Sequence, residues 1–376
     1  MLHAMERKLA SIQTIVALNP INKADRIERA TVMGWNVVVK KGEFSVGDKC
    51  VFFEIDSVLP SDVEWSQFLK DHSFRVSTMK LRGVISQGLA LPLSILFADA
   101  SIYDVGQDVT DIAGVTQWLP PEDSVVDGAK AYPFPAGIPK SHATRVQSCP
   151  GVLDELRHVD FIVTMKCDGK SATFLKRDGE LVVASHLRSM ERPDKDRTGN
   201  IFWQMAEKYE FEKKLPEGMS VQGEICGPGI EGNPMRLSNP EFFVYDVFDI
   251  GTAKYLDFDD MISFCRPPGH GMTVQGDWLS IVPIVMQIQF HGTGYSMYVN
   301  SGGILNSVMT VPVGEFDLTL ERCLAMADGM YPGTDSPREG IVIKPMQEKV
   351  SEALGFARLQ IKVHSVDYLL GANKKG

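Results

Sequence analysis

Apolar and polar residues alternate over short stretches in the first third of the chain, with turn residues between them. These stretches cover residues 12–18, 35–39, 49–55 and 81–92, and glycine interrupts the last one. Short alternating runs with frequent turns predict a small closed antiparallel sheet. About five strands fit an OB-type β-barrel, a common platform for nucleic acid, and a barrel without a binding role fits the same pattern. A small polar helix is predicted over residues 24–29.

The second half mixes strand-length apolar runs with one amphipathic stretch. Residues 171–176 and 181–185 flank Asp178-Gly179, a preferred two-residue hairpin turn. Residues 201–214 have the spacing of a helix. Further strands are predicted at 220–225, 242–248, 339–344 and 359–363. The second half is therefore predicted to be an α+β domain built on antiparallel strands.

Proline and small residues mark the boundary between the halves. The prolines of this stretch are Pro120, Pro121, Pro133, Pro135 and Pro139. We predict an OB-fold nucleic-acid-binding domain at 1–115, a linker and lead-in at 116–145, and a second domain at 146–376. The segment 257–315 predicts no particular structure.

Composition narrows the class of protein. A chain of 376 residues is long enough for two domains. No apolar run is long enough to span a bilayer and the start lacks a signal-peptide core, so a cytoplasmic protein is expected. The six cysteines form no C-x-x-C pair, which argues against a zinc site or a disulfide framework. The net charge of -10 excludes nucleic-acid binding by bulk charge, so any such contact needs a local basic face.

The most informative chemical signal is Lys166-Cys167-Asp168-Gly169, which follows the apolar run Phe161-Ile162-Val163. A lysine at a strand end, an aspartate two residues later and a glycine turn suit a lysine that carries a nucleotide covalently. Lys170 is a competing nucleophile in the same loop, but only Lys166 has Asp-Gly at the required spacing. Because so short a motif recurs by chance, its interpretation depends on the residues downstream.

Polar residues recur downstream on predicted strands. In chain order they are Gly223-Glu224, Phe242-Phe243-Val244-Tyr245-Asp246, Glu339-Gly340-Ile341-Val342-Ile343-Lys344 and Gln360-Ile361-Lys362. The carboxylates of Asp168, Glu224 and Glu339 lie on different strands and can together hold hydrated Mg²⁺, which prefers oxygen ligands and keeps several waters. Each carboxylate alone is more often a solvated charge.

This order of motifs closely resembles the covalent nucleotidyltransferase superfamily of DNA ligases, RNA ligases and mRNA-capping enzymes, from about Phe161 onwards. The first half resembles the N-terminal OB domain of the fifth RNA-ligase family. The stretches that carry this second resemblance are MGWNVVVK (33–40), EFSVGD (43–48), FEIDSVLP (53–60) and LRGVISQGL (81–89). With GPGIEGNP (227–234) added in the second half, the resemblance covers nearly the whole chain. The resemblance implies an α+β fold, an OB-type β-barrel followed by an antiparallel-sheet nucleotidyltransferase (ATP-grasp-like ligase) domain.

The resemblance also implies roles for the site residues. Lys166 is the nucleophile and must attack as a neutral amine, so neighbouring cations and a bound metal have to depress its pKa. One metal would neutralise the α-phosphate and a second would orient the pyrophosphate. Glu224 also accepts a hydrogen bond from a ribose hydroxyl. Gly169 completes the nucleotide-binding turn, and the implied cofactors are ATP and Mg²⁺ or Mn²⁺.

Two lysines and two aromatic residues complete the expected nucleotide site. Lys344 and Lys362 are expected to contact phosphate as point charges. Tyr245 occupies the position where the superfamily stacks an aromatic ring on the purine. Phe243 lies on the same strand face, so the sequence leaves open which ring stacks.

Two arginines and three departures from the family pattern concern the charge of the site. The resemblance implies that Arg145 contacts the ATP phosphates and that Arg188 contacts the ribose or the substrate 5′-phosphate; a surface charge fits each equally well. Met165 stands where relatives often have glutamate, and Gln360 replaces the first lysine of the last motif. His186 stands where the family usually has arginine. These changes bear on the rate of one or more steps.

The implied activity is that of an ATP-dependent RNA ligase that seals 3′-OH and 5′-phosphate ends at nicks in a duplex. It would act through a lysyl-AMP intermediate and an adenylylated 5′-phosphate end. The implied partner is RNA or an RNA-containing duplex; neither a membrane nor an obligate protein partner is evident. The alternatives are a DNA ligase, a capping-type guanylyltransferase, or a non-catalytic nucleic-acid-binding protein.

Overall fold

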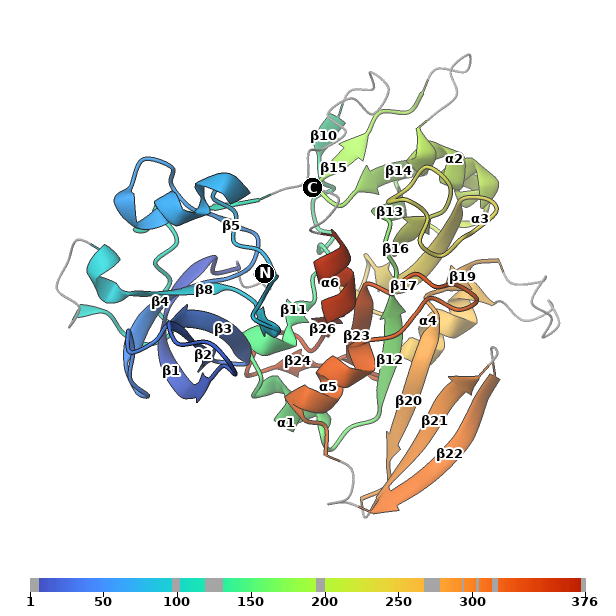
Figure 1. Ribbon diagram of the computed structural model, residues 1–376. Helices are drawn as coiled ribbons and strands as arrows, with labels where there is room; N and C mark the ends of the chain where they lie inside the picture. The colour runs from blue at the N-terminus through green and yellow to red at the C-terminus, as the bar shows by residue number, and fades with distance from the viewer. Residues whose placement is uncertain are drawn as a thin grey trace. The chain divides into compact units, whose positions relative to one another are not determined.

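The chain divides into two compact units, as the computed structural model in Figure 1 shows. The structure describes residues 7–96, 102–118, 131–193, 200–266, 278–292, 294–301, 304–312 and 317–372. The first unit comprises Met1–Glu122, Arg145–Gly151 and Leu369–Gly376, and the second comprises Asp123–Thr144 and Val152–Tyr368. The units differ from the predicted domains because 145–151 and 369–376 group with the first unit. Residues 119–130 of the predicted linker lie outside the described residues.

The first unit contains a curled antiparallel sheet in the order β3-β2-β1-β4-β8. Its strands are β1 (Ala10–Pro20), β2 (Ile27–Val32), β3 (Trp35–Lys40), β4 (Lys49–Phe53) and β8 (Leu89–Pro92). Residues 10–14 of β1 pair with β4 and residues 15–20 pair with β2, with a register shift between Ile15 and Ala17. Such a bulge bends the strand and lets one sheet curl around a core. The predicted OB-type fold is confirmed.

Strand β2 shows that the predicted helix over residues 24–29 is wrong. Its residues Ala30 and Val32 are fully buried, and Thr31 between them is more exposed. They pack in the same core as Trp35 and Val37 of β3. Burial at every second position therefore decides the conformation here, although the segment is locally polar.

Two antiparallel sheets build the second unit. The first sheet runs β10-β15-β14-β13-β16-β17-β18, and β19 pairs with β17. Its strands are β10 (Ala131–Pro133), β13 (Lys170–Arg177), β14 (Glu180–Ser185), β15 (Arg188–Met190), β16 (Met219–Cys226), β17 (Glu241–Asp249), β18 (Lys254–Tyr255) and β19 (Ser280–Ile281). The second sheet includes the run β26-β23-β12-β20-β21-β22. These strands are β12 (Phe161–Lys166), β20 (Ile284–Phe290), β21 (Gly294–Ser301), β22 (Ile304–Pro312), β23 (Gly340–Pro345) and β26 (Ile361–His364).

Short elements connect and cover these sheets (Figure 1). The α-helices are α1 (Val152–Leu156), α2 (Ile201–Lys208), α3 (Phe211–Lys214), α4 (Phe258–Cys265), α5 (Leu320–Ala327) and α6 (Val366–Ala372). The single helix predicted over 201–214 is interrupted, because Glu210 has a φ of 52° and starts α3 anew. Phe202 of α2 and Phe211 of α3 pack on the first sheet, against Phe174 and Phe242. None of the helices in the described residues is both long and apolar enough to cross a bilayer.

The hairpin predicted around Asp178-Gly179 is present between β13 and β14. The segment 257–315, for which the sequence predicted no structure, contains three strands that pair consecutively. Asp178 and Gly179 have φ values of 55° and 77°, which a two-residue hairpin turn requires. Within 257–315, the structure describes α4 and the strands β19 to β22, and β20, β21 and β22 pair consecutively. The antiparallel pairing of β23 with both β12 and β26 then brings together strands that are far apart in sequence.

At Gly340 the backbones of β23 and β26 leave no room for a side chain. Its φ is 151°, and a Cβ there would lie 2.0 Å from the carbonyl oxygen of Val363. No side chain fits at that separation, so the glycine of the E-G-I-V-I-K motif is a requirement of packing.

We therefore expect Gly340→Ala to lower the free energy of unfolding by at least about 2 kcal/mol. The measurement is the midpoint of thermal unfolding followed by circular dichroism. Gly151→Ala is the control, because a Cβ there has nothing within 4 Å and no unusual φ. Equal midpoints for the two variants would contradict the close approach.

Candidate active site

Three lysines share one face of the second sheet. Lateral partners in a sheet point to the same face, as do residues two apart on one strand. Gly340, Val342 and Lys344 therefore share a face of β23. Lys166 lies opposite Gly340, and Lys362 lies opposite Val342. The register thus places Lys166, Lys344 and Lys362 on a common face.

The ammonium of Lys166 lies among carboxylates. Its Nζ donates to Glu339 Oε2 at 2.6 Å, and the two side chains are 25% and 13% exposed. His364 Nε2 lies 3.5 Å from the other oxygen of Glu339. Asp168 and Glu224 also act on the charge of Lys166. The lysine and the three carboxylates singled out in the sequence are therefore brought together.

These groups shift one another's pKa. Burial alone would lower the pKa of Lys166, but the negative charges of Glu339, Glu224 and Asp168 outweigh it and the pKa is raised. Burial raises the pKa of Glu224 to about 8, against the opposing effect of Lys166. Burial and the charge of Glu339 likewise raise the pKa of Asp168. In the free protein the lysine is thus held protonated, while two carboxylates resist ionisation.

The donor set fits a divalent cation with few direct protein ligands. In the described part of the chain, no three His, Cys, Asp or Glu side chains are placed to hold one ion together. Lys166 instead occupies the position between Glu339 and the other carboxylates as an internal cation. Magnesium commonly binds one or two carboxylates and completes its shell with water and phosphate. Burial and the negative charge of Glu339 raise the pKa of Asp168 and of Glu224, and a divalent cation would offset that charge.

Two aromatic side chains lie beside Glu224 on one face of the first sheet. Ser171 lies opposite Glu224, which lies opposite Phe243, so the three share a face. The hydroxyls of Tyr245 and Ser171 are 2.8 Å apart, so Tyr245 lies on this face too. Phe243 and Tyr245 are half-buried and pack on the apolar cluster of Cys167, Cys226 and Val282. Both rings therefore remain candidates for stacking.

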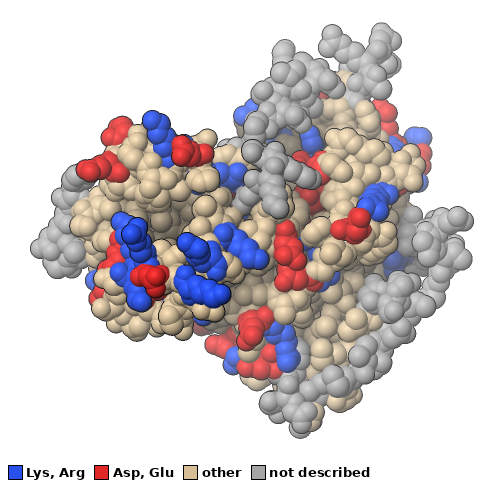
Figure 2. All heavy atoms as spheres, in the orientation of Figure 1, with Lys and Arg blue, Asp and Glu red and all other residues tan. Residues whose placement is uncertain are grey.

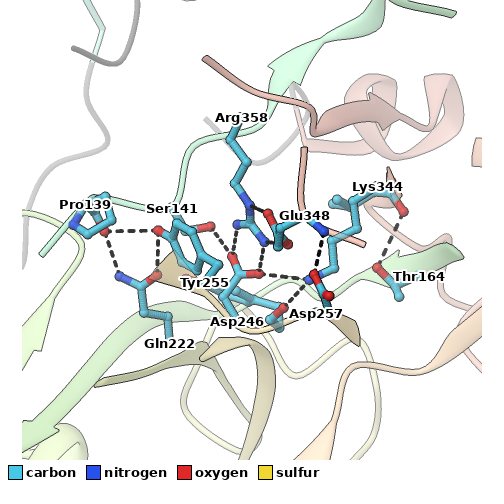
Figure 3. Close-up of polar contacts among 12 residues, drawn as sticks. Pro139, Ser141, Thr164, Gln222, Asp246, Tyr255, Asp257, Lys344, Glu348 and Arg358 are labelled. Atoms are coloured by element: carbon cyan, nitrogen blue, oxygen red, sulfur yellow. Dashed lines mark hydrogen bonds and ion pairs between the residues drawn. The ribbon is translucent and has the colours of Figure 1, made fainter. Parts of the chain in front are cut away.

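Lys344 is held in a buried ion cluster (Figure 3). Its Nζ donates to Asp246 Oδ1 and to the carbonyl of Tyr245, both at 2.8 Å, and only 6% of its side chain is exposed. Arg358 donates two 2.7 Å bonds to the same carboxylate, and Ser141 donates a third, also at 2.7 Å. Asp246 belongs to the first sheet and Lys344 to the second, so this cluster ties the two sheets together.

The remaining candidates lie in different settings. Arg145 belongs to the first unit, where its Nη2 lies 3.1 Å from Asp56 Oδ2. Arg188 begins β15 and is exposed. His186 is exposed as a residue, yet the partial burial of its ring and the charges of Lys140, Lys362 and Lys166 lower its pKa.

Two departures from the family pattern, Met165 and Gln360, are both buried. Met165 is 6% exposed and lies opposite Ile341, so its side chain occupies the face of β12 that does not carry Lys166. Gln360 is 6% exposed, and its Oε1 lacks a hydrogen-bond partner among the described residues. An apolar residue suits the first position, whereas a polar group stays unsatisfied at the second.

Sequence reasoning missed several residues that surround Lys166. Tyr368 hydrogen-bonds Asp168, and His364 contacts Glu339. The period of two along β26 from Lys362 was a signal for His364. Tyr331 bonds the backbone on both sides of the site, but it lies in an irregular segment that gave no signal.

Comparisons with known proteins match both halves of the chain. A family model described as an OB-fold domain matches residues 9–93, and one described as RNA ligase matches residues 159–364. A search of curated proteins returns no match.

Solved structures of Naegleria gruberi RNA ligase are similar over nearly the whole chain. A mutant with AMP and Mn is 31% identical, with a TM-score of 0.78, covering 97% of this chain and 99% of that one. A second mutant, with ATP and Mn, has the same identity, TM-score and coverage. The ligase with PPi is 31% identical with a TM-score of 0.78, covering 98% and 100%.

The buried cluster predicts the consequence of removing its central charge. Asp246→Asn leaves Lys344 and Arg358 without their carboxylate, so the free energy of unfolding should fall by about 3–5 kcal/mol. Asp154→Asn removes one side of the exposed pair with Arg157 and should cost at most about 1 kcal/mol. Chemical denaturation of both variants measures the difference.

Acid should weaken the same cluster in the parent protein. Burial opposes ionisation of Asp246, but Arg358 and Lys344 more than offset it and lower its pKa. Because the pKa of Asp246 is lower in the folded than in the unfolded state, its ionised form stabilises the fold at every pH above the unfolded-state pKa, near 3.9. This stabilisation is lost progressively as the pH falls below that value. The melting temperature of the parent should therefore fall below about pH 4, and that of Asp246→Asn should fall less. Parallel curves for the two would contradict this.

Proposed function

The chain belongs to the RNA ligase family, and on that premise we propose that it is an ATP-dependent RNA ligase that seals 3′-OH and 5′-phosphate ends at nicks in a duplex. The observation that carries the proposal is the position of Lys166 Nζ, 2.6 Å from Glu339 and within the charge field of Asp168 and Glu224. A surface lysine has no such setting. Support also comes from relatives solved with ATP, AMP and PPi.

In the first step, the neutral amine of Lys166 attacks the α-phosphorus of ATP. A nitrogen–phosphorus bond forms, the bond to the leaving oxygen breaks, pyrophosphate departs, and the amine gives up a proton. Because the carboxylates hold Lys166 as an ammonium in the free protein, its proton has to leave before attack. Phe243 or Tyr245 stacks on the base, and Lys362 contacts phosphate.

Two transfers complete the reaction. An oxygen of the RNA 5′-phosphate attacks the phosphorus of lysyl-AMP, which frees Lys166 and gives an adenylylated end. The 3′-hydroxyl then attacks the 5′-phosphate, forms the new phosphodiester and releases AMP. Covalent storage divides one difficult condensation into easier steps.

Asp168, Glu224 and Glu339 would hold Mg²⁺ or Mn²⁺ through one or two direct bonds and through water. When bound there, a divalent cation supplies positive charge that lowers the pKa of the lysine and offsets charge on the phosphate. In this proposal Lys344 acts on the phosphate through its charge and without direct contact, because its ammonium is hydrogen-bonded to Asp246. Contacts of Arg145 and Arg188 with phosphate or ribose remain part of the proposal.

In this proposal the first unit binds the nucleic acid. In the view of Figure 2, Lys and Arg side chains gather over the strands of this unit, although the whole chain has a net charge of -10. A local basic face of this kind suits the phosphate backbone. All six cysteines lie in the described residues and carry thiols, which suits the reducing cytoplasm.

The primary test is the intact mass of the protein after incubation with ATP and Mg²⁺. The parent and Lys170→Ala should gain one AMP, and Lys166→Ala should gain none, because Lys166 lies among the carboxylates and has Asp-Gly at the spacing of the motif. Gain of GMP from GTP instead would favour a capping-type enzyme. Absence of any adduct in the parent with either nucleotide and either metal would reject the proposal, and retained nick binding would then favour a binding protein.

The substrate preference is tested with nicked duplexes. A nick with an RNA 3′-OH strand should be sealed at least about tenfold faster than one with a DNA 3′-OH strand, if the site uses the 2′-hydroxyl. A nick with a 5′-hydroxyl is the negative control. Equal rates on RNA and DNA nicks would indicate a DNA ligase.

A further inference from the structure

One buried hydroxyl joins the two strand ends that carry the nucleophile and its carboxylate partner. Tyr331 Oη donates to the carbonyl of Lys166 at 3.1 Å. It accepts from the backbone N–H of Asp168 at 3.0 Å and from that of Glu339 at 3.2 Å. A phenolic hydroxyl has one donor and two acceptor positions, so its capacity is fully used.

The position of this hydroxyl follows from where the strand ladder ends. Strands β12 and β23 pair as far as Lys166 and Gly340. Beyond that pair the chain turns away into the Asp168-Gly169 loop, so the N–H groups of Asp168 and Glu339 have no ladder partner. Buried backbone N–H groups need one. The Tyr331 hydroxyl accepts from both N–H groups, and it thereby adds one hydrogen bond beyond the end of the ladder on each of the two strands.

The segment that carries Tyr331 is itself rigidly closed. The Arg338 N–H donates to the carbonyl of Gly329 at 2.9 Å, and the Tyr331 N–H donates to that of Ser336 at 3.0 Å. The Arg338 guanidinium donates to the carbonyl of Ala327 at 3.1 Å, at the end of α5. With only 1% of the residue exposed, Tyr331 has little freedom to move.

We propose that Tyr331 is a positioning residue, whose hydroxyl fixes Lys166 against Glu339 and Asp168 for the first step of the reaction. This inference rests on the proposed function, because it assigns the step at which positioning matters. Tyr331 itself does not touch the reacting atoms. Its hydroxyl sets the backbone from which the nucleophile and two carboxylates project, and a small misplacement of reacting groups costs much of the rate.

The test is lysyl-AMP formation by Tyr331→Phe in a single turnover across a range of ATP concentrations. The maximal rate should fall about tenfold or more, while the half-saturating ATP concentration stays within about threefold, because the ring and the nucleotide contacts remain. Tyr295→Phe is the matched control. Tyr295 is also buried, and its hydroxyl donates to the carbonyl of Arg157, outside the site. Both its parameters should match the parent.

Hydrogen exchange separates positioning from general damage. In Tyr331→Phe, the amides of Asp168 and Glu339 should exchange faster, while those of β13 and β16 keep the protection of the parent. Loss of protection throughout the second unit would overturn the proposal, as would a maximal rate within twofold of the parent. A change in the half-saturating ATP concentration without a change in the maximal rate would also overturn the proposal. A parent that forms no lysyl-AMP would instead reject the proposed function itself.

Discussion

The carboxylate of Asp246 is the group on which the arrangement of the second unit depends. It lies on β17 of one sheet, and it receives hydrogen bonds from Lys344 on β23 of the other sheet and from Arg358. A buried charge is costly unless it is paired and fully hydrogen-bonded, so no sliding of one sheet against the other leaves this cluster intact. Because β23 also pairs with β12, the same cluster determines where Lys166 ends up. Catalytic geometry and stability are thus linked through one strand.

The two lysines of this strand pair show how burial decides a role. Lys344 and Lys166 lie on the same sheet face, yet Lys344 has its charge matched by Asp246 and is almost fully enclosed. Lys166 has a quarter of its side chain exposed and shares its surroundings with more carboxylates than it can neutralise. The first is therefore a cation held in a buried ion cluster. The second is a group whose charge changes when another cation enters the site.

Much of this could be predicted from the sequence, because the motif residues occupy regular strands. Period-two alternation placed Lys166, Glu224, Tyr245 and Lys362 on strands, and the structure places them there or at a strand end. The ends of strands carry no such information. Tyr331 acts from an irregular segment, and its partners are backbone groups, which every residue has. The helix predicted over residues 24–29 is wrong for a different reason. The segment is locally polar, but Ala30 and Val32, which follow it, are buried in the sheet as part of β2.

The resting charge of the site bears on the proposed role of Lys166 as the nucleophile. An amine with a raised pKa is almost wholly protonated at neutral pH and cannot attack phosphorus. The carboxylates that cause this are Glu339, Glu224 and Asp168, and burial raises the pKa values of Glu224 and Asp168 themselves. Added positive charge therefore stabilises the carboxylates and favours the neutral lysine at the same time. In the proposed reaction, binding of a cation at the site would therefore also activate Lys166.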